Sequence, residues 1–259
     1  MKVLGLGTND KEKLVVEFEV ERTVKRDYGY EEKYLMYGGQ SIPYKAIIKD
    51  GKVLAIVSRF YRLLENEKVE QIVRRWADHN NYEVKDVRYE GARLHAIVVS
   101  GTGDGIVVHN SVDGSMAFRA DAILDVGDAM AIFKTKELGG IVYRKHTKNL
   151  DEFVKQCGKM FDEVLKACRK YREFLRLLDE RYAKEYERAI IALRDVMPKK
   201  CVASAVVRVV YGDAQITLMD VYRMIAQRIW ADREHSFKRK VELFEELNKT
   251  FAAMVMFEL

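Results

Sequence analysis

Two histidines of this chain could form a small site, because they lie in consecutive segments that are both expected to be strands. His95 and His109 flank a glycine-rich turn, so pairing of the two strands would bring their imidazoles together. Asp104 and Asp113 would then lie nearby, and such a group could hold a divalent ion for phosphodiester chemistry. None of the five histidines lies in a His-Glu-x-x-His or Cys/His array. The sequence therefore assigns no metal ligand and no cofactor.

Familiar catalytic motifs are missing from the sequence. The loop 101–105 is rich in glycine, but it lacks the Lys-Ser/Thr of a P-loop and the spacing of a dinucleotide fingerprint. It is therefore predicted to be a hairpin turn. The sequence contains no nucleophile elbow, kinase motif set or Walker motif. These observations favour a protein that is not an enzyme, with a metal-dependent nuclease as the less favoured alternative.

The segment 110–115 has the composition of a tight turn. Asn110, Ser111, Asp113 and Ser115 have short polar side chains that can bond to the backbone of a turn. Gly114 is expected to adopt a positive φ. We therefore predict a mainly structural role for this motif.

The same segment resembles a motif of a known family. His109–Arg119 is similar to the Asn-Ser-His-Asp-Gly-Ser signature of the phage/plasmid-like proteins, also called domain of unknown function 932. Tyr143–Lys148, which contains His146 and Thr147, resembles the His-Thr motif that precedes a long helix in that family. Thr217–Tyr222 is similar to a Thr-aromatic element near the family's C-terminus.

The resemblance covers most of the chain from about residue 34 onward, with two departures. Val112 stands where the family has a histidine, and 120–126 replaces its Arg-Val-x-Cys-x-Asn stretch. The resemblance implies an origin on a virus or plasmid, and therefore a protein that acts in a host cell. It implies no established activity.

The composition excludes some classes of protein. No apolar run approaches the ~20 residues of a membrane helix, and the first residues lack the apolar core of a secretory signal. We therefore expect a cytoplasmic protein without a membrane partner. Three cysteines without a paired spacing, Cys157, Cys168 and Cys201, are expected to be structural. Many Lys, Arg and Glu with only seven Asn and five Gln indicate a thermophilic source.

Positive charge is concentrated in the second half of the chain. Residues 144–200 contain sixteen Lys and Arg against ten Asp and Glu, a local charge of +6, while the whole chain carries +5. Clustered cations favour phosphate binding, and interleaved aromatic rings such as Tyr171, Phe174, Tyr182 and Tyr186 favour base stacking. A solvated helix face is the alternative interpretation. The predicted nucleic-acid-binding residues are Arg144, Lys145, Lys148, Arg169, Lys170, Arg172 and Arg176.

The first half of the chain is expected to be rich in strands. Alternating apolar and polar residues predict a strand at 16–24, and Asp50-Gly51 predicts a tight hairpin between 44–49 and 52–57. Apolar residues at helical spacing from Val69 to Trp76 predict one amphipathic helix. Three or four further strands are expected among the segments 82–89, 93–100, 105–111 and 116–125. These elements predict an antiparallel sheet with a helix packed on one face.

The second half is expected to be helical. Asn149 and Glu152 form a capping-box pattern, and an apolar stripe then continues to Met197, over roughly 70 Å if the helix is unbroken. The helix must either break near Asp179 or pack against another helix or subunit. The segment 201–211 fits a strand or a buried helix, and a last helical region follows from about Thr217.

Together these elements predict an α+β fold, with a strand-rich region 1–148 and a helical region 149–259 that can pack together as one domain. The long apolar stripes favour a homo-oligomer. The leading functional hypothesis is a non-catalytic nucleic-acid-binding protein of a virus or plasmid, acting in single-strand binding or annealing during replication or recombination. The main alternative is an assembly factor, such as a host-defence antagonist or a virion component.

Overall fold

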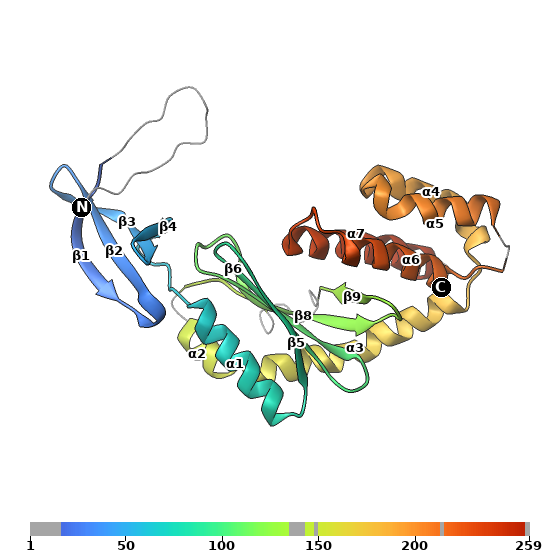
Figure 1. Ribbon diagram of the computed structural model, residues 1–259, viewed down its shortest axis with the longest axis horizontal. Helices are drawn as coiled ribbons and strands as arrows, with labels where there is room; N and C mark the ends of the chain where they lie inside the picture. Colours follow the sequence, from blue (N-terminus) through green and yellow to red (C-terminus); the bar gives the residue numbers. More distant parts are fainter. Residues whose placement is uncertain (1–16, 135–142, 148–149, 213–214, 257–259) are drawn as a thin grey trace, which may run out of the picture.

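The computed structural model describes residues 17–134, 143–147, 150–212 and 215–256. Antiparallel sheets make up most of the first half, and most of the helices belong to the second half (Figure 1). The α+β class expected from the sequence is therefore confirmed. Within the described residues, no helix has both the length and the apolar character that a membrane crossing requires.

The first sheet is a four-stranded antiparallel meander in the order β1-β2-β3-β4. Its strands are β1 (Glu19–Lys25), β2 (Tyr30–Tyr37), β3 (Gln40–Lys49) and β4 (Lys52–Ser58). The predicted hairpin at Asp50-Gly51 is confirmed, since these residues have φ values of 49° and 76°. Two consecutive positive φ angles match the twist of the flanking strands.

The second sheet has six strands in the order β10-β8-β7-β6-β5, with β9 also paired to β8. Its strands are β5 (Glu83–Glu90), β6 (Arg93–Val99), β7 (Asp104–Ser111), β8 (Phe118–Asp125), β9 (Met130–Phe133) and β10 (Tyr143–Arg144). All four candidate segments of this region form strands. The sequence did not predict that they form a sheet separate from the first one.

Helices cover both faces of the six-stranded sheet (Figure 1). On one face lie α1 (Asn66–His79) and α3 (Cys157–Asp179), which meet where Trp76 packs on Phe161 with ring centroids 5.0 Å apart. On the other face lie α6 (Leu218–Ala231) and α7 (Phe237–Met256). The apolar core is continuous across residue 148, because one cluster joins the sheet to helices before and after it. The four-stranded sheet has small clusters of its own.

The long apolar stripe of the second half is divided among several helices. It breaks at Gln156, between α2 (Leu150–Lys155) and α3, and again after Asp179, where the sequence allowed a break. After a 3-10 turn come α4 (Glu187–Val196) and α5 (Lys199–Tyr211), so the ambiguous segment 201–211 is a helix. Thr217 and Asp220 form a capping box at the start of α6. The predicted N-cap Asn149 and the basic residue Lys148 lie outside the described residues.

The three cysteines are free and buried. Burial raises the pKa of Cys157 to about 11 and that of Cys168 to about 12. Thiolates are the reactive form of cysteine, so at neutral pH these side chains act as small apolar groups of the core.

Candidate nucleic-acid interface

The two sheets meet at Tyr61, in the segment that leads from β4 to α1. The Tyr61 hydroxyl donates a hydrogen bond to the carbonyl oxygen of Ser111, at 3.0 Å. Its ring stacks on the His146 ring, with centroids 4.9 Å apart and planes 2° from parallel. The Arg62 N–H donates to the His146 carbonyl at 3.0 Å, and His146 Nδ1 lies 3.0 Å from the Arg62 carbonyl. The motifs at 110–115 and 146–147 are therefore held together through this segment.

The turn at 111–116 has most of the predicted geometry. The Ser115 N–H donates to Asp113 Oδ1 at 2.9 Å, and Ser111 Oγ bonds to both the N–H and the carbonyl of Met116, each at 2.9 Å. Gly114 has the expected positive φ, at 75°. Burial raises the pKa of Asp113, but hydrogen bonds from Ser115 and Ser111 outweigh it and hold that pKa below its usual value. The carboxylate therefore stays ionised as the acceptor of this turn.

Asn110 has a different role from the one predicted. It was expected to cap the turn, but its side-chain N–H₂ donates to the Leu64 carbonyl at 2.9 Å and to Asn66 Oδ1 at 2.8 Å. The residue is fully buried, and a buried amide needs such partners. Asn110 therefore links β7 to the start of α1 by hydrogen bonds and does not cap the turn.

Two hollows lie side by side at this junction and share Phe60, Tyr61 and Thr147 as wall residues. The first, the cation hollow, has a volume of about 660 Å³. Its other lining residues are Arg22, Tyr34, Lys45, Arg59 and Arg62. The second, the motif hollow, has a volume of about 400 Å³. Its other lining residues include Ser58, Gly114, Ser115, Tyr143, Lys145 and His146. We call the two hollows together the junction cleft.

Positive charge in the junction cleft is mostly not neutralised by the protein. Arg22, Arg59, Arg62 and Lys145 form no ion pair with any residue that the structure describes. Lys45 is different, because it pairs with the buried Glu32. Cations without an internal partner are available to a bound anion, and they repel one another until one arrives.

His146 adds no charge to the cleft. Burial lowers its pKa to about 4, so the ring is neutral at physiological pH. With its Nδ1–H directed at the Arg62 carbonyl and its face against Tyr61, it has a structural role at the junction.

Comparison with known proteins does not identify the chain. No protein-family model matches it, and neither a curated protein nor a solved structure matches it. The resemblance of the motifs to phage/plasmid-like proteins stays a prediction. Function must therefore be inferred from the junction cleft itself.

The predicted basic residues fall into two separate regions. Arg144 pairs with Phe118 at the start of β8, and the adjacent Lys145 lines the motif hollow. Arg172 instead binds at the other end of β8, where its guanidinium donates to the Asp125 carbonyl at 2.7 Å. The eight residues of β8 are joined by seven steps of about 3.3 Å, which separate these ends by about 23 Å. The basic segment predicted from the sequence is thus not one continuous surface.

Several of these cations already have partners within the chain. The Arg144 guanidinium lies over the Phe153 ring, 4.6 Å from its centroid. Arg172 forms an ion pair with Asp104 at 2.5 Å, and Arg176 one with Glu180 at 3.0 Å. Arg169 and Lys170 are exposed on α3.

The aromatic rings expected to stack on bases are mostly within the core or packed against it, except Tyr182, which is 52% exposed. Tyr171 stacks on Phe133 with centroids 4.6 Å apart, and Phe174 is buried. Phe60, which the sequence reasoning missed, is 75% exposed. The tetrapeptide 59–62, Arg-Phe-Tyr-Arg, carried a recognisable signal, since two aromatic residues flanked by arginines suit a single strand.

The predicted approach of His95 and His109 is confirmed, but the predicted acids are not beside them. The two Nδ1 atoms lie 2.7 Å apart, and both side chains are fully buried. The neighbouring acids are Asp121, whose Oδ2 lies 3.3 Å from His109 Nε2, and Glu90, whose Oε2 lies 3.7 Å from His95 Nε2. Asp104 lies at the far end of β7, and Asp113 in the turn. The correction follows from strand register, which places Asp121 rather than either predicted acid on the histidine face of the sheet.

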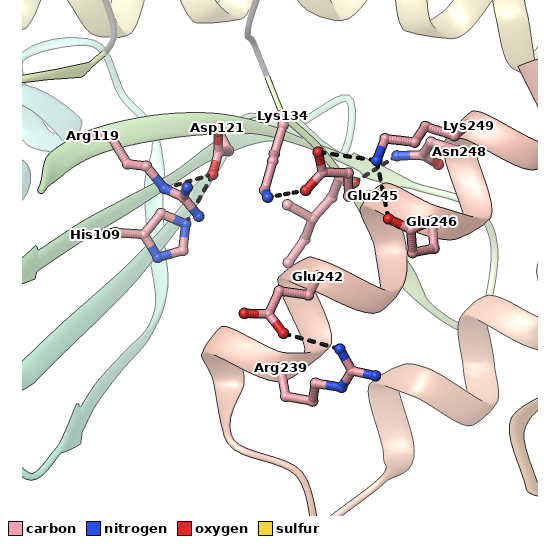
Figure 2. A network of polar contacts seen from close by, with 11 residues as sticks. His109, Arg119, Asp121, Lys134, Arg239, Glu242, Glu245, Glu246, Asn248 and Lys249 are labelled. Carbon is pink, nitrogen blue, oxygen red and sulfur yellow. Dashed lines mark hydrogen bonds and ion pairs between the residues drawn. The ribbon is translucent and has the colours of Figure 1, made fainter. Parts of the chain in front are cut away.

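These groups form a structural network under α7. Figure 2 shows Asp121 between His109 and Arg119, with Lys134 reaching Glu245 of α7. Burial lowers the pKa of His95 to about 2, so a neutral imidazole pair is the stable form. No group of three or more His, Cys, Asp or Glu that could hold a metal occurs within the part of the chain that the structure describes.

Proposed function

We propose that this protein binds nucleic acid in the junction cleft without catalysing a reaction on it, and that unpaired strands are its ligands. Binding or annealing of single strands during viral or plasmid replication or recombination, in the cytoplasm of a host cell, is the role that fits this proposal. The mobile-element context rests on the resemblance of the motifs at 110–115 and 146–147.

One observation carries the proposal. Four cations, Arg22, Arg59, Arg62 and Lys145, surround a single cleft and have no acidic partner among the described residues. Each phosphate that such a cation neutralises releases a counterion, which makes binding favourable and dependent on salt. The cleft also presents exposed aromatic surface at Phe60, which every base can stack on.

The same features favour binding over catalysis. The histidine of the cleft, His146, is buried, neutral and held by Tyr61 and Arg62. A general base is most effective when its pKa lies near the working pH, whereas burial lowers the pKa of His146 to about 4.

Salt-dependent binding tests the proposal. A fluorescently labelled 20-nucleotide single strand and the corresponding duplex are titrated with protein at several NaCl concentrations, and anisotropy is measured. We expect tight retention of the single strand at low salt, with a log-log slope near −0.7 for each phosphate contacted. Absence of binding to any single- or double-stranded DNA or RNA at low salt would overturn the proposal.

A second candidate function, protein assembly, is favoured by a different surface. Val196, Val207 and Tyr211 on α4 and α5 are 50%, 53% and 84% exposed. Homo-oligomerisation through this pair of helices is the form we propose. The sequence suggested oligomerisation because its long apolar stripes were expected to be too extensive for one sheet to cover. The structure gives a different reason, since the apolar stripes of α3 and α6 are buried in the core of the chain itself. Light scattering tests the idea, and a monomer of 30.1 kDa at all concentrations would contradict it.

A further inference from the structure

Phe60 is the exposed aromatic residue among the three residues that the two hollows of the junction cleft share. It lines both of them, with 75% of its surface exposed. No ring contact within the described residues covers it. An exposed aromatic residue that lines two adjacent hollows is accessible to a ligand that occupies both of them.

The backbone holds Phe60 firmly in this position. The Phe60 N–H donates to Ser58 Oγ at 3.3 Å, and the Tyr61 N–H donates to the Ser58 carbonyl at 2.9 Å. The Arg59 N–H donates to the Pro43 carbonyl at 2.9 Å. The next residue, Tyr61, is fixed by its stack on His146. Because the turn is held by these bonds, no backbone ordering is needed when a ligand stacks on the ring.

We propose that Phe60 inserts between two successive bases of an unpaired strand, one base lying in the cation hollow and the other in the motif hollow. This inference rests on the proposed function and specifies its ligand as a step of two unpaired nucleotides. Arg59 and Arg62 lie on either side of the Phe60-Tyr61 pair in the chain, so the phosphates of that step meet positive charge. Each hollow falls within the range of about 300–1,000 Å³ that small-molecule sites occupy.

The insertion explains why single strands are favoured. In a duplex the same ring would have to unstack and unpair neighbouring bases, which costs a few kcal/mol per step. An unpaired strand opens one stack and regains it on the two faces of Phe60. Stacking on an aromatic ring is tolerant of sequence, because every base has a π-face.

Two variants of Phe60 and one control test the insertion on the full chain. With a labelled dT₁₂ strand, Phe60→Ala is expected to lower affinity about 5- to 150-fold and leave the salt slope unchanged, because it removes stacking and no charge. Tyr182→Ala, which removes an exposed ring outside the two hollows, is expected to leave strand affinity and salt slope unchanged. Phe60→Trp is expected to keep the affinity, and its added fluorescence is expected to be quenched when the strand stacks on it.

The outcomes separate this inference from the proposed function. If the wild type binds dT₁₂ with salt dependence but Phe60→Ala binds equally well, or if Phe60→Trp shows no quenching, the insertion is wrong and the cleft binds by charge alone. If the wild type binds no strand at low salt, the proposed function fails and the insertion fails with it. A strand with two adjacent abasic sites at its centre gives a further check of the stacking. This strand must be so short that it can bind only with its central step at Phe60. It should bind the wild type as weakly as the intact strand binds Phe60→Ala.

Discussion

The junction cleft and the surface of α3 are both basic, but their cations are in different states. In the cleft, Arg59, Arg62 and Lys145 line a hollow and have no acidic partner among the described residues. On α3, Arg172 is bound to Asp104 and Arg176 to Glu180, while Arg169 and Lys170 are exposed on an open helix surface that lines neither hollow. A count of charges along the sequence favours α3 as the binding surface for a polyanion. A polyanion, however, binds most favourably to cations that no acidic residue of the protein already neutralises. This difference is why we propose the interface in the cleft rather than on α3.

Removal of one tyrosine in each region should give the largest contrast. Tyr61→Ala loses the stack on His146 and the hydrogen bond to Ser111, and we expect it to lower the free energy of unfolding by about 3 kcal/mol and to abolish strand binding. Tyr171→Ala, which removes the stack on Phe133, should cost a similar free energy and leave binding intact in the folded protein. Urea unfolding and anisotropy measure the two effects. Equal loss of binding in both variants would remove the distinction between the regions.

Acid should weaken the junction through His146, whereas α3 contains no histidine. Burial lowers the pKa of His146 to about 4 in the folded protein, below the unfolded value of about 6.5. The unfolded state therefore takes up the proton first, and stability is lost as the pH falls from about 6.5 to about 4. The contribution of this residue is roughly 2–4 kcal/mol.

The variant His146→Phe keeps a ring against Tyr61 but cannot be protonated. We expect the free energy of unfolding in urea to differ less between pH 7 and pH 4 for this variant than for the wild type. The reduction should be roughly 2–4 kcal/mol. His95 and His109 remain in both proteins and cancel in the comparison. If His146→Phe and the wild type lost the same free energy of unfolding between pH 7 and pH 4, burial of His146 would not be the source of the acid sensitivity.

Glycines of the two regions should respond in opposite directions to added side chains. Gly114→Val places a β-branched residue at φ 75°, and its Cβ would lie 3.4 Å from a ring carbon of Tyr61. A cost of about 1–2 kcal/mol should lower the melting temperature by about 2–8 °C. Gly158→Ala at the start of α3 meets only an ordinary contact with Trp76, and it should raise stability by about 0.5–1 kcal/mol. If Gly114→Val kept the wild-type melting temperature but no longer bound the strand, the loop would contact the ligand directly.

Local chemistry made much of the fold predictable. The hairpin at Asp50-Gly51, the strands 93–100 and 105–111 and the approach of His95 to His109 all follow from turn residues and the two-residue period of a strand. The break after Asp179 could be placed for a similar reason, because few residues determine where a helix ends.

Long-range partners could not be predicted in the same way. Arg172 binds Asp104 across 68 residues of sequence, and nothing near either residue indicates the pair. The stack of Tyr61 on His146, two lining residues of the motif hollow, likewise depends on how the two sheets pack. The sequence showed which residues were charged, but only the packed structure shows which charges are already neutralised.

The salt dependence of two matched triple variants tests the central claim most directly. One variant replaces Arg59, Arg62 and Lys145 by Gln in the cleft, and the other replaces Arg169, Lys170 and Arg176 by Gln on α3. Arg172 is left in place because its contacts with Asp104 and the Asp125 carbonyl serve stability.

Both variants lose three positive charges, so the overall charge of the protein changes equally. With a single strand of 20 nucleotides, we predict that the cleft variant has a log-log salt slope shallower by about two, from three phosphates at about 0.7 each, while the α3 variant keeps the wild-type slope. A wild-type slope in the cleft variant, together with a slope shallower by about two in the α3 variant, would contradict the account and move the interface to α3.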